Sequence, residues 1–171
     1  MGPSDPPGTT YIPGLRENLH GLFTINLGVY VPEVARIRSG GEANSWVQEY
    51  HCCVRSRLGE VCGEQQDIWW QARHDEAVID DVVCNFKEGG LSFLERFSTR
   101  DKIIQECSDR FENMWVGDPP QIILAIILFE RGERQAALIS LERQLKFALE
   151  TGRRGHSDYV RELATTMGMK L

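Results

Sequence analysis

The sequence predicts an α+β fold, in which a small and mostly antiparallel sheet packs against helices and a C-terminal helical lobe extends the domain. Two observations lead to this prediction. Apolar and polar residues alternate from Leu22 to Val31, which is the period of a strand with two different faces. From residue 98 onward, apolar residues instead recur at helical spacing in one segment after another.

Length and composition fit one compact and ordered domain. The chain has 171 residues, of which 42% are hydrophobic and 26% charged, so an adequate core can form. A formal net charge of -6 argues against general nucleic-acid binding, which normally goes with an excess of basic residues. The longest apolar run, Ile122 to Phe129, is far shorter than the roughly 20 residues that span a bilayer, and no leader-like segment opens the chain. We therefore expect a cytoplasmic protein that does not enter the membrane.

The chain divides into three parts. Residues 1–21 contain four of the seven prolines and four glycines, so we expect this segment to be irregular or disordered. Residues 22–97 form the sheet-and-helix core, and residues 98–171 form a helical lobe that packs on the same domain.

The core is expected to contain three strands followed by a helix. The strands are Leu22 to Val31, Trp46 to Leu58 and Asp67 to Arg73. The helix runs from about Asp75 to Lys87, and its wide apolar stripe, which includes Ile79 and Val83, is expected to lie on the sheet. Gly89-Gly90 then predicts a break or kink before a second short helix.

The helical lobe is expected to contain a helical hairpin. The run Ile122 to Phe129 is apolar on every side, so this helix must be surrounded by protein. Arg131-Gly132-Glu133 predicts a turn into a partner helix with its own apolar face. Only one such hairpin is found, so we interpret it as part of the core and not as a repeat.

Three segments of the core resemble a known bacterial family. They are Phe23-Thr-Ile-Asn-Leu-Gly-Val-Tyr-Val-Pro, Cys53-x-Arg55-x-Arg57-Leu58-Gly59 and Trp69-Trp70, and they are similar to domain of unknown function family 4304 over about residues 22–97. The resemblance brings no established activity. It does imply that a helix and two further strands usually precede the first strand, whereas only 22 residues precede Phe23 here. The sheet would then have an open edge, through which two copies of the chain could form a homodimer.

Candidate binding residues lie on the polar faces of the predicted strands. If these faces align, they form a basic and aromatic surface made of Asn26, Tyr30, Arg55, Arg57, Arg73, Trp69 and Trp70. Such a surface suits a carboxylate, a phosphate or an acidic patch on another protein, because arginine binds planar anions with two hydrogen bonds. Alternatively, the arginines pair with the nearby carboxylates of Glu60, Glu64, Asp67 or Asp75 and only solubilise the sheet. The two tryptophans point to opposite faces, so at most one of them is expected to be fully buried in the main core.

A catalytic interpretation has less support. His51 could act as a general base and Cys53 as a nucleophile, but the sequence shows no third group that would orient them. The five cysteines contain no Cys-x-x-Cys pair, so we expect neither a metal nor another cofactor. We therefore expect a non-enzymatic protein that binds another protein, in a regulatory or toxin-neutralising setting. The alternative is a small hydrolase or anion-binding enzyme that uses His51, Cys53, Arg55 and Arg57.

Overall fold

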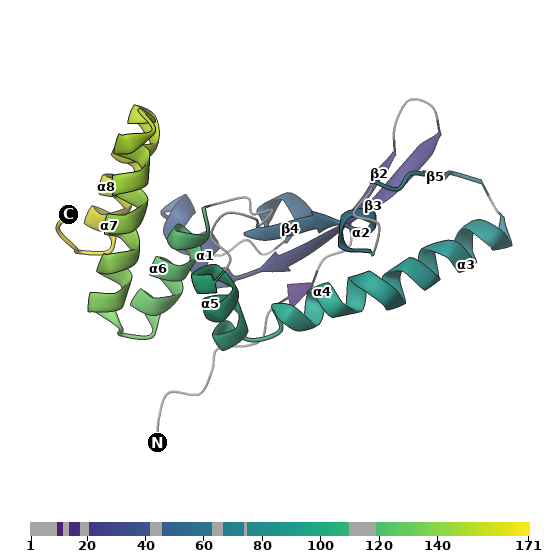
Figure 1. The fold of residues 1–171 in the computed structure, drawn as a ribbon, viewed down its shortest axis with the longest axis horizontal. Coiled ribbons are helices and arrows are strands. Elements are labelled where there is room, and N and C mark those ends of the chain that lie inside the picture. The colour runs from purple at the N-terminus through teal and green to yellow at the C-terminus, as the bar shows by residue number, and fades with distance from the viewer. Residues whose placement is uncertain are drawn as a thin grey trace, which may run out of the picture.

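A computed structural model of the chain describes residues 10–11, 14–17, 21–41, 46–62, 67–73, 75–109 and 119–171. The model confirms the predicted α+β class. An antiparallel sheet lies beside a long helix at one end of the molecule, and a group of helices forms the other end (Figure 1). Of the helices in these ranges, none is long and apolar enough to cross a membrane.

The central strand of the sheet is β3 (Leu22–Tyr30), which confirms the predicted first strand almost residue for residue. Asn26 of β3 pairs with both β2 (Gly14–Glu17) and β4 (Val54–Arg57), so these strands lie on opposite edges of β3. Val29 pairs with both β1 (Thr10–Tyr11) and β4, so β1 lies on the same edge of β3 as β2. Phe23 pairs with both β2 and β5 (Trp70–Gln71), so β5 lies on the same edge of β3 as β4. All of these pairings are antiparallel.

Both faces of β3 are buried along its second half. The apolar face contributes Leu27 and Val29 to the core. On the polar face, Thr24, Asn26 and Tyr30 are also buried, with no more than 5% of each residue exposed. The alternation of the sequence therefore marks a strand that is covered on both sides, whereas the binding surface predicted from the sequence requires an accessible polar face.

Three expectations about the sheet are wrong in extent. The segment of residues 1–21, expected to be irregular, contributes β1 and β2, which gain their hydrogen-bond partners from β3. The predicted strand from Trp46 to Leu58 shrinks to β4, because residues Glu49–His51 form a short 3-10 turn, η1, instead. The predicted strand from Asp67 to Arg73 shrinks to the two residues of β5.

Short helices connect the strands. Helix α1 (Pro32–Ser39) begins directly after β3, where Pro32 supplies a backbone angle that suits a first helical turn, and it ends at Gly40 with φ of 66°. Helix α2 (Leu58–Val61) follows β4 directly and contributes the fully buried Leu58 to the core.

The helix predicted at 75–87 is observed as α3 (Glu76–Asn85), and it continues without a break. The side chain of Asp75 caps its N-terminus by accepting a hydrogen bond from the backbone of Ala77. The chain then forms one π-helical turn, η2 (Phe86–Gly90), in which the N–H of Leu91 donates to the carbonyl of Phe86, and passes into α4 (Leu91–Arg96) (Figure 1).

The two glycines of η2 allow close packing and do not break the helix. A Cβ atom placed on Gly89 would lie 2.7 Å from the carbonyl oxygen of Val61 in α2, and one on Gly90 would lie 2.8 Å from the ring of Phe86. The expected break at Gly89-Gly90 is therefore wrong, because the missing side chains serve a helix–helix contact. The apolar stripe of α3 covers the core only in part, since Ile79 and Val83 remain 50% and 43% exposed.

The helical lobe contains α5 (Arg100–Asp109), α6 (Pro120–Glu130), α7 (Arg134–Glu150) and α8 (Arg154–Thr166). Helix α6 is buried from Pro120 to Leu128 and packs against α1, α5 and α7, as its continuous apolar run predicted. The predicted hairpin is formed by α6 and α7, and α8 also packs against α7.

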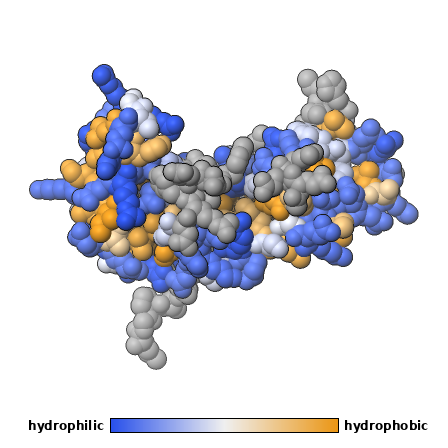
Figure 2. All heavy atoms as spheres, in the orientation of Figure 1, coloured by the Kyte–Doolittle hydropathy of each residue, from blue (hydrophilic) through white to orange (hydrophobic). Residues whose placement is uncertain are grey.

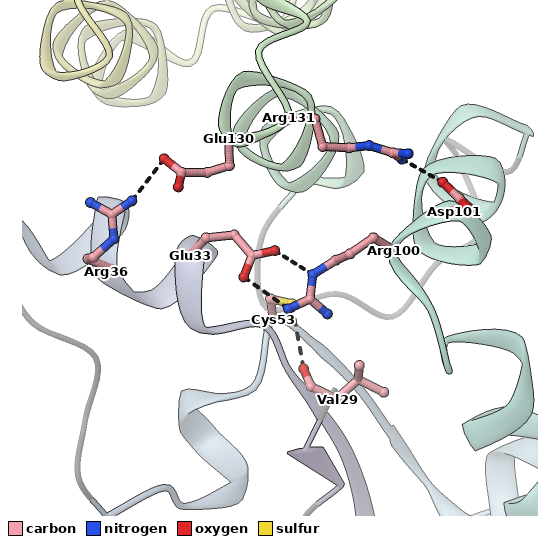
Figure 3. Close-up of polar contacts among 8 residues, drawn as sticks. All are labelled: Val29, Glu33, Arg36, Cys53, Arg100, Asp101, Glu130 and Arg131. Atoms are coloured by element: carbon pink, nitrogen blue, oxygen red, sulfur yellow. Dashed lines mark hydrogen bonds and ion pairs between the residues drawn. The ribbon is translucent and has the colours of Figure 1, made fainter. Parts of the chain in front are cut away.

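Ion pairs join the lobe to the sheet-bearing part of the chain. Figure 3 shows charged side chains of α1 that reach toward those of α5 and α6. We refer to these contacts as the α1–α5–α6 network, which consists of the ion pairs Glu33–Arg100, Arg36–Glu130 and Arg131–Asp101. The pair Glu33–Arg100 is buried, because its side chains are only 12% and 11% exposed.

Candidate protein-binding surface

The polar faces of β3 and β4 align as the sequence predicted. In the register of the two strands, Asn26 lies opposite Arg57 and Gly28 lies opposite Arg55. Because directly opposed residues of an antiparallel pair project from the same face, both arginines share the face of Asn26. Asn26 is itself buried, so the arginines form the accessible part of this face.

Arg57 forms a compact cluster with Trp69 and Asp67. Its guanidinium group makes an ion pair with Asp67 and lies 5.5 Å from the centre of the Trp69 ring. The indole N–H of Trp69 donates to the same carboxylate oxygen of Asp67 at 2.9 Å. Asp67 therefore neutralises Arg57 and fixes the tryptophan, and the cluster presents a cation–π contact rather than a free cation.

The other two predicted arginines also have carboxylate partners. Arg55 pairs with Glu49 of η1 at 3.6 Å, and Arg73 pairs with Asp75 at 3.8 Å. Arg73 is 64% exposed in its side chain, so its pair adds little stability. The partners of Arg57 and Arg73, Asp67 and Asp75, are two of the four carboxylates that the sequence offered for such pairing, whereas Glu49 was not among them.

Of the two adjacent tryptophans, Trp70 lies in the core and Trp69 lies at the surface. Trp70 is only 5% exposed, its ring centre lies 5.8 Å from that of Phe23, and its indole N–H donates to Asp81 of α3 at 2.7 Å. It thereby holds α3 against the sheet. Trp69 is half-buried and remains accessible beside Arg57.

Tyr30 lies away from the accessible arginine surface. Its side chain is 3% exposed, and its hydroxyl group has no hydrogen-bond partner among the described residues. Together with Trp70 and Asn26, Tyr30 is a part of the predicted site that the structure places in the interior.

Two exposed aromatic residues were missed by the sequence reasoning. Trp46 is 74% exposed and Tyr50 is 61% exposed, although both had been assigned to a strand. Tyr50 lies in η1, where the backbone N–H of Gln48 donates to Nδ1 of His51 at 2.9 Å and the Tyr50 and His51 rings are 4.3 Å apart. Gly40-Gly41 before this segment was the available signal for a loop, since paired glycines favour turns.

The exposed aromatic residues Trp46 and Tyr50 lie on η1 and just before it, and Trp69 contacts Arg57 of β4. Glu49 of η1 connects this turn to β4 through its ion pair with Arg55. We define the η1–β4 surface by Trp46, Glu49, Tyr50, Arg55, Arg57 and Trp69.

His51 and Cys53 each have a local structural role. Cys53 is 2% exposed, and its thiol donates to the carbonyl of Val29 at 3.5 Å, which ties β4 to β3 (Figure 3). Burial raises the pKa of the neighbouring Cys52 thiol to about 12, so this sulfur stays protonated near neutral pH. Within the described ranges, no group of three His, Cys, Asp or Glu residues is arranged to hold a metal ion.

Comparison with protein families gives one match. The model of the family described as "Domain of unknown function (DUF4304)" matches residues 17–96, which run from the end of β2 to the end of α4. This confirms the resemblance that the sequence showed over residues 22–97. Comparison with curated proteins found no match, and comparison with solved structures found none either.

Proposed function

We propose that this chain, in which residues 17–96 belong to the DUF4304 family, is a non-enzymatic protein that binds another protein through the η1–β4 surface. The observation that carries the proposal is the exposure of Trp46 and Tyr50, at 74% and 61%. A regulatory or toxin-neutralising role in the cytoplasm of a bacterium would suit such a protein.

Large exposed aromatic rings are typical anchors of protein interfaces. A tryptophan or tyrosine can bury roughly 150–250 Å² of surface in a partner at a small cost in conformational entropy. Tryptophan, tyrosine and arginine are also the residue types that most often dominate the binding energy of an interface. The η1–β4 surface contains all three, in Trp46, Tyr50 and Arg55.

The charges on this surface indicate what kind of partner it would bind. Arg55 and Arg57 already have the carboxylates of Glu49 and Asp67 as partners, so an acidic ligand would have to compete with them. A protein with an apolar pocket for Trp46 and a rim carrying both signs of charge fits better than a phosphate or a nucleic acid.

Two other proposals are compatible with the chain but have less support. A homodimer could form at a sheet edge, since among the described strands none pairs with the outer edge of β2. An enzyme using His51 and Cys53 would need a reactive thiol, whereas the Cys53 thiol is buried and donates to a backbone carbonyl.

Affinity capture from a lysate of the native host tests the main proposal. The full chain would be compared with Trp46→Ala, Tyr50→Ala, and retained proteins would be quantified by mass spectrometry. We expect a protein that the unaltered bait retains to fall at least about tenfold with the double variant, as the loss of a hot spot implies.

A matched control is provided by Ile79→Ala, Val83→Ala. This variant also truncates two exposed apolar side chains, but on α3. It should retain the same protein as the unaltered bait, and all three baits should unfold at similar temperatures because the altered residues are exposed. Equal retention by the Trp46 and Tyr50 variant would refute the proposed surface. If the α3 variant loses the captured protein as strongly as the Trp46 and Tyr50 variant does, the interface would include α3.

A further inference from the structure

Helix α7 carries apolar residues on two sides, and the described part of the chain covers only one of them. The inner side packs against α6 and α8 through fully buried residues such as Leu141 and Ala148. The outer side exposes Ile139 and Leu149, which are 40% and 55% accessible, and Leu171 near Leu149 is 41% accessible. Figure 2 shows hydrophobic side chains gathered among hydrophilic ones at this end of the molecule.

A shallow groove runs along the outer side of α7. It has a volume of about 430 Å³ and is lined by Leu145, Leu149 and Leu171 together with three charged residues, Glu142, Lys146 and Glu150. We call this region the α7 groove. Its charged residues follow one another at intervals of four, so they form one row along the helix.

The order of these charges indicates which occupant the groove accepts. Suppose that two α7 helices pack antiparallel, with the twofold axis at the level of residue 144. Glu142 of each copy then lies opposite Lys146 of the other. The same register places Ile139 of each copy opposite Leu149 of the other. A parallel arrangement would instead place Glu142 against Glu142. An antiparallel arrangement with its axis at the level of residue 146 would place Glu142 against Glu150. Both arrangements bring like charges together and are repulsive.

We propose that a second copy of this chain occupies the α7 groove, forming an antiparallel dimer with twofold symmetry. Each opposite-charge pair and each apolar pair then occurs twice, as in any interface formed by the same patch of two subunits. The exposed stripe of α3 offers no such match, because Glu76–Asn85 contains three carboxylates and no basic residue, so two copies would repel each other there.

The proposed dimer is weak and depends on concentration. Helix α7 has 17 residues and is therefore about 25 Å long, which limits the contact to a few side chains from each copy. Stable complexes usually bury about 1,200–2,000 Å² in total, and smaller interfaces belong to transient complexes. The dissociation constant should accordingly be of the order of 10 µM or weaker.

Sedimentation velocity of the full chain over a wide concentration range tests the proposal. We expect Leu149→Asp and Lys146→Glu each to raise the dissociation constant of the dimer at least about tenfold. The double variant Glu142→Lys, Lys146→Glu exchanges the two charges and should restore dimerisation, because lysine at 142 again faces glutamate at 146 in the second copy. The matched control is Leu91→Asp, since Leu91 is 50% exposed on α4, and it should leave the dissociation constant unchanged.

The outcomes separate this dimer from other associations. A chain that stays monomeric at the highest concentration would overturn the proposal. A dimer that persists in Leu149→Asp would also overturn it, and would favour a sheet edge as the interface. Dimerisation that is lost in Lys146→Glu and not restored by the charge exchange would reject the antiparallel register.

Discussion

Arg100 of α5 donates two hydrogen bonds to the carboxylate of Glu33 in α1, although 67 positions separate the two residues in the sequence. The bond from Nη2 to Oε2 is 3.0 Å long, and both side chains are almost excluded from solvent. This pair joins the part of the chain that matches the DUF4304 family to the helices that follow it.

Removing one charge of the buried pair should destabilise the protein strongly. In Glu33→Gln the guanidinium of Arg100 stays buried without its counter-charge, so we expect the free energy of unfolding to fall by about 3 kcal/mol. Asp158→Asn is the matched control, because Asp158 pairs with Arg161 at an exposed site and its loss should cost less than about 1 kcal/mol. Urea unfolding of both variants measures the difference. Equal losses in the free energy of unfolding would show that the buried pair stabilises the protein no more than the exposed pair does.

The same glycine substitution should have opposite effects at two positions. Gly89→Ala places a methyl group 2.7 Å from the carbonyl oxygen of Val61 and 2.8 Å from the sulfur of Cys62, so we expect a loss of about 1–3 kcal/mol. Gly155→Ala in α8 meets no atom within 4 Å and should gain up to about 1 kcal/mol, since alanine favours a helix. Thermal unfolding of the two variants checks the signs, and a stable Gly89→Ala protein would contradict the close approach of α2 and η2.

Thiol alkylation near neutral pH should modify Cys84 first. Cys84 is exposed, whereas the other four cysteines are buried. Its hydrogen bond to Glu88 and the charge of that carboxylate raise the pKa of the Cys84 thiol, so Glu88→Gln should speed its reaction. Mass spectrometry of partially alkylated protein identifies the site. Preferential modification of Cys53 would instead support the enzymatic alternative.

Stability should fall on acidification partly because of His156. Its Nε2 lies 2.8 Å from Nε2 of Gln144, which is 1% exposed, so the amide donates to a neutral imidazole. Burial, and secondarily the charge of Arg153, lower the pKa of His156 below 6.5. The folded state then binds fewer protons than the unfolded state in the window below 6.5, so stability is full above this pH and is lost as the pH falls.

The variant His156→Asn isolates this effect from the titration of carboxylates. We expect the free energy of unfolding to drop less between about pH 7.5 and pH 5 in the variant than in the unaltered protein. Denaturant unfolding at both pH values measures the two drops. Identical drops would mean that His156 has the same affinity for protons in both states.

The parts of the fold that the sequence predicted are those specified by local patterns. β3 follows from its strict alternation, and α6 follows from an apolar run that requires neighbours on every side. The turn η1 was missed because the hydrogen bond from Gln48 to His51 competes with strand pairing, and a pattern of apolar residues does not record it. The strands before residue 21 were missed because pairing with β3, and not their own composition, gives them their structure.

The candidate site was predicted only in part for a similar reason. The alignment of Arg55 and Arg57 on one face follows from the period of a strand, and the register of β3 and β4 shows it. Whether Trp69 or Trp70 is accessible depends on Asp81 and Phe23, which belong to other elements. The exposure of Trp46 and Tyr50 was not predicted, because aromatic residues of this kind usually help to form a core, and Gly40-Gly41 was the one local signal against a strand here.

The π-helical turn also constrains which insertions and deletions the protein tolerates. An α-helix advances by about 100° per residue, and the hydrogen bond from Leu91 to Phe86 accommodates one residue more than a regular turn would. A one-residue deletion within Phe86–Gly90 would restore a regular helix and leave Phe93 and Phe97 facing the core. The same deletion in the regular part of α3 would rotate them by about 100° relative to the residues before it. Homologous chains that are one residue shorter in this region should therefore lack the residue in this turn, where both phenylalanines stay buried, and not in α3.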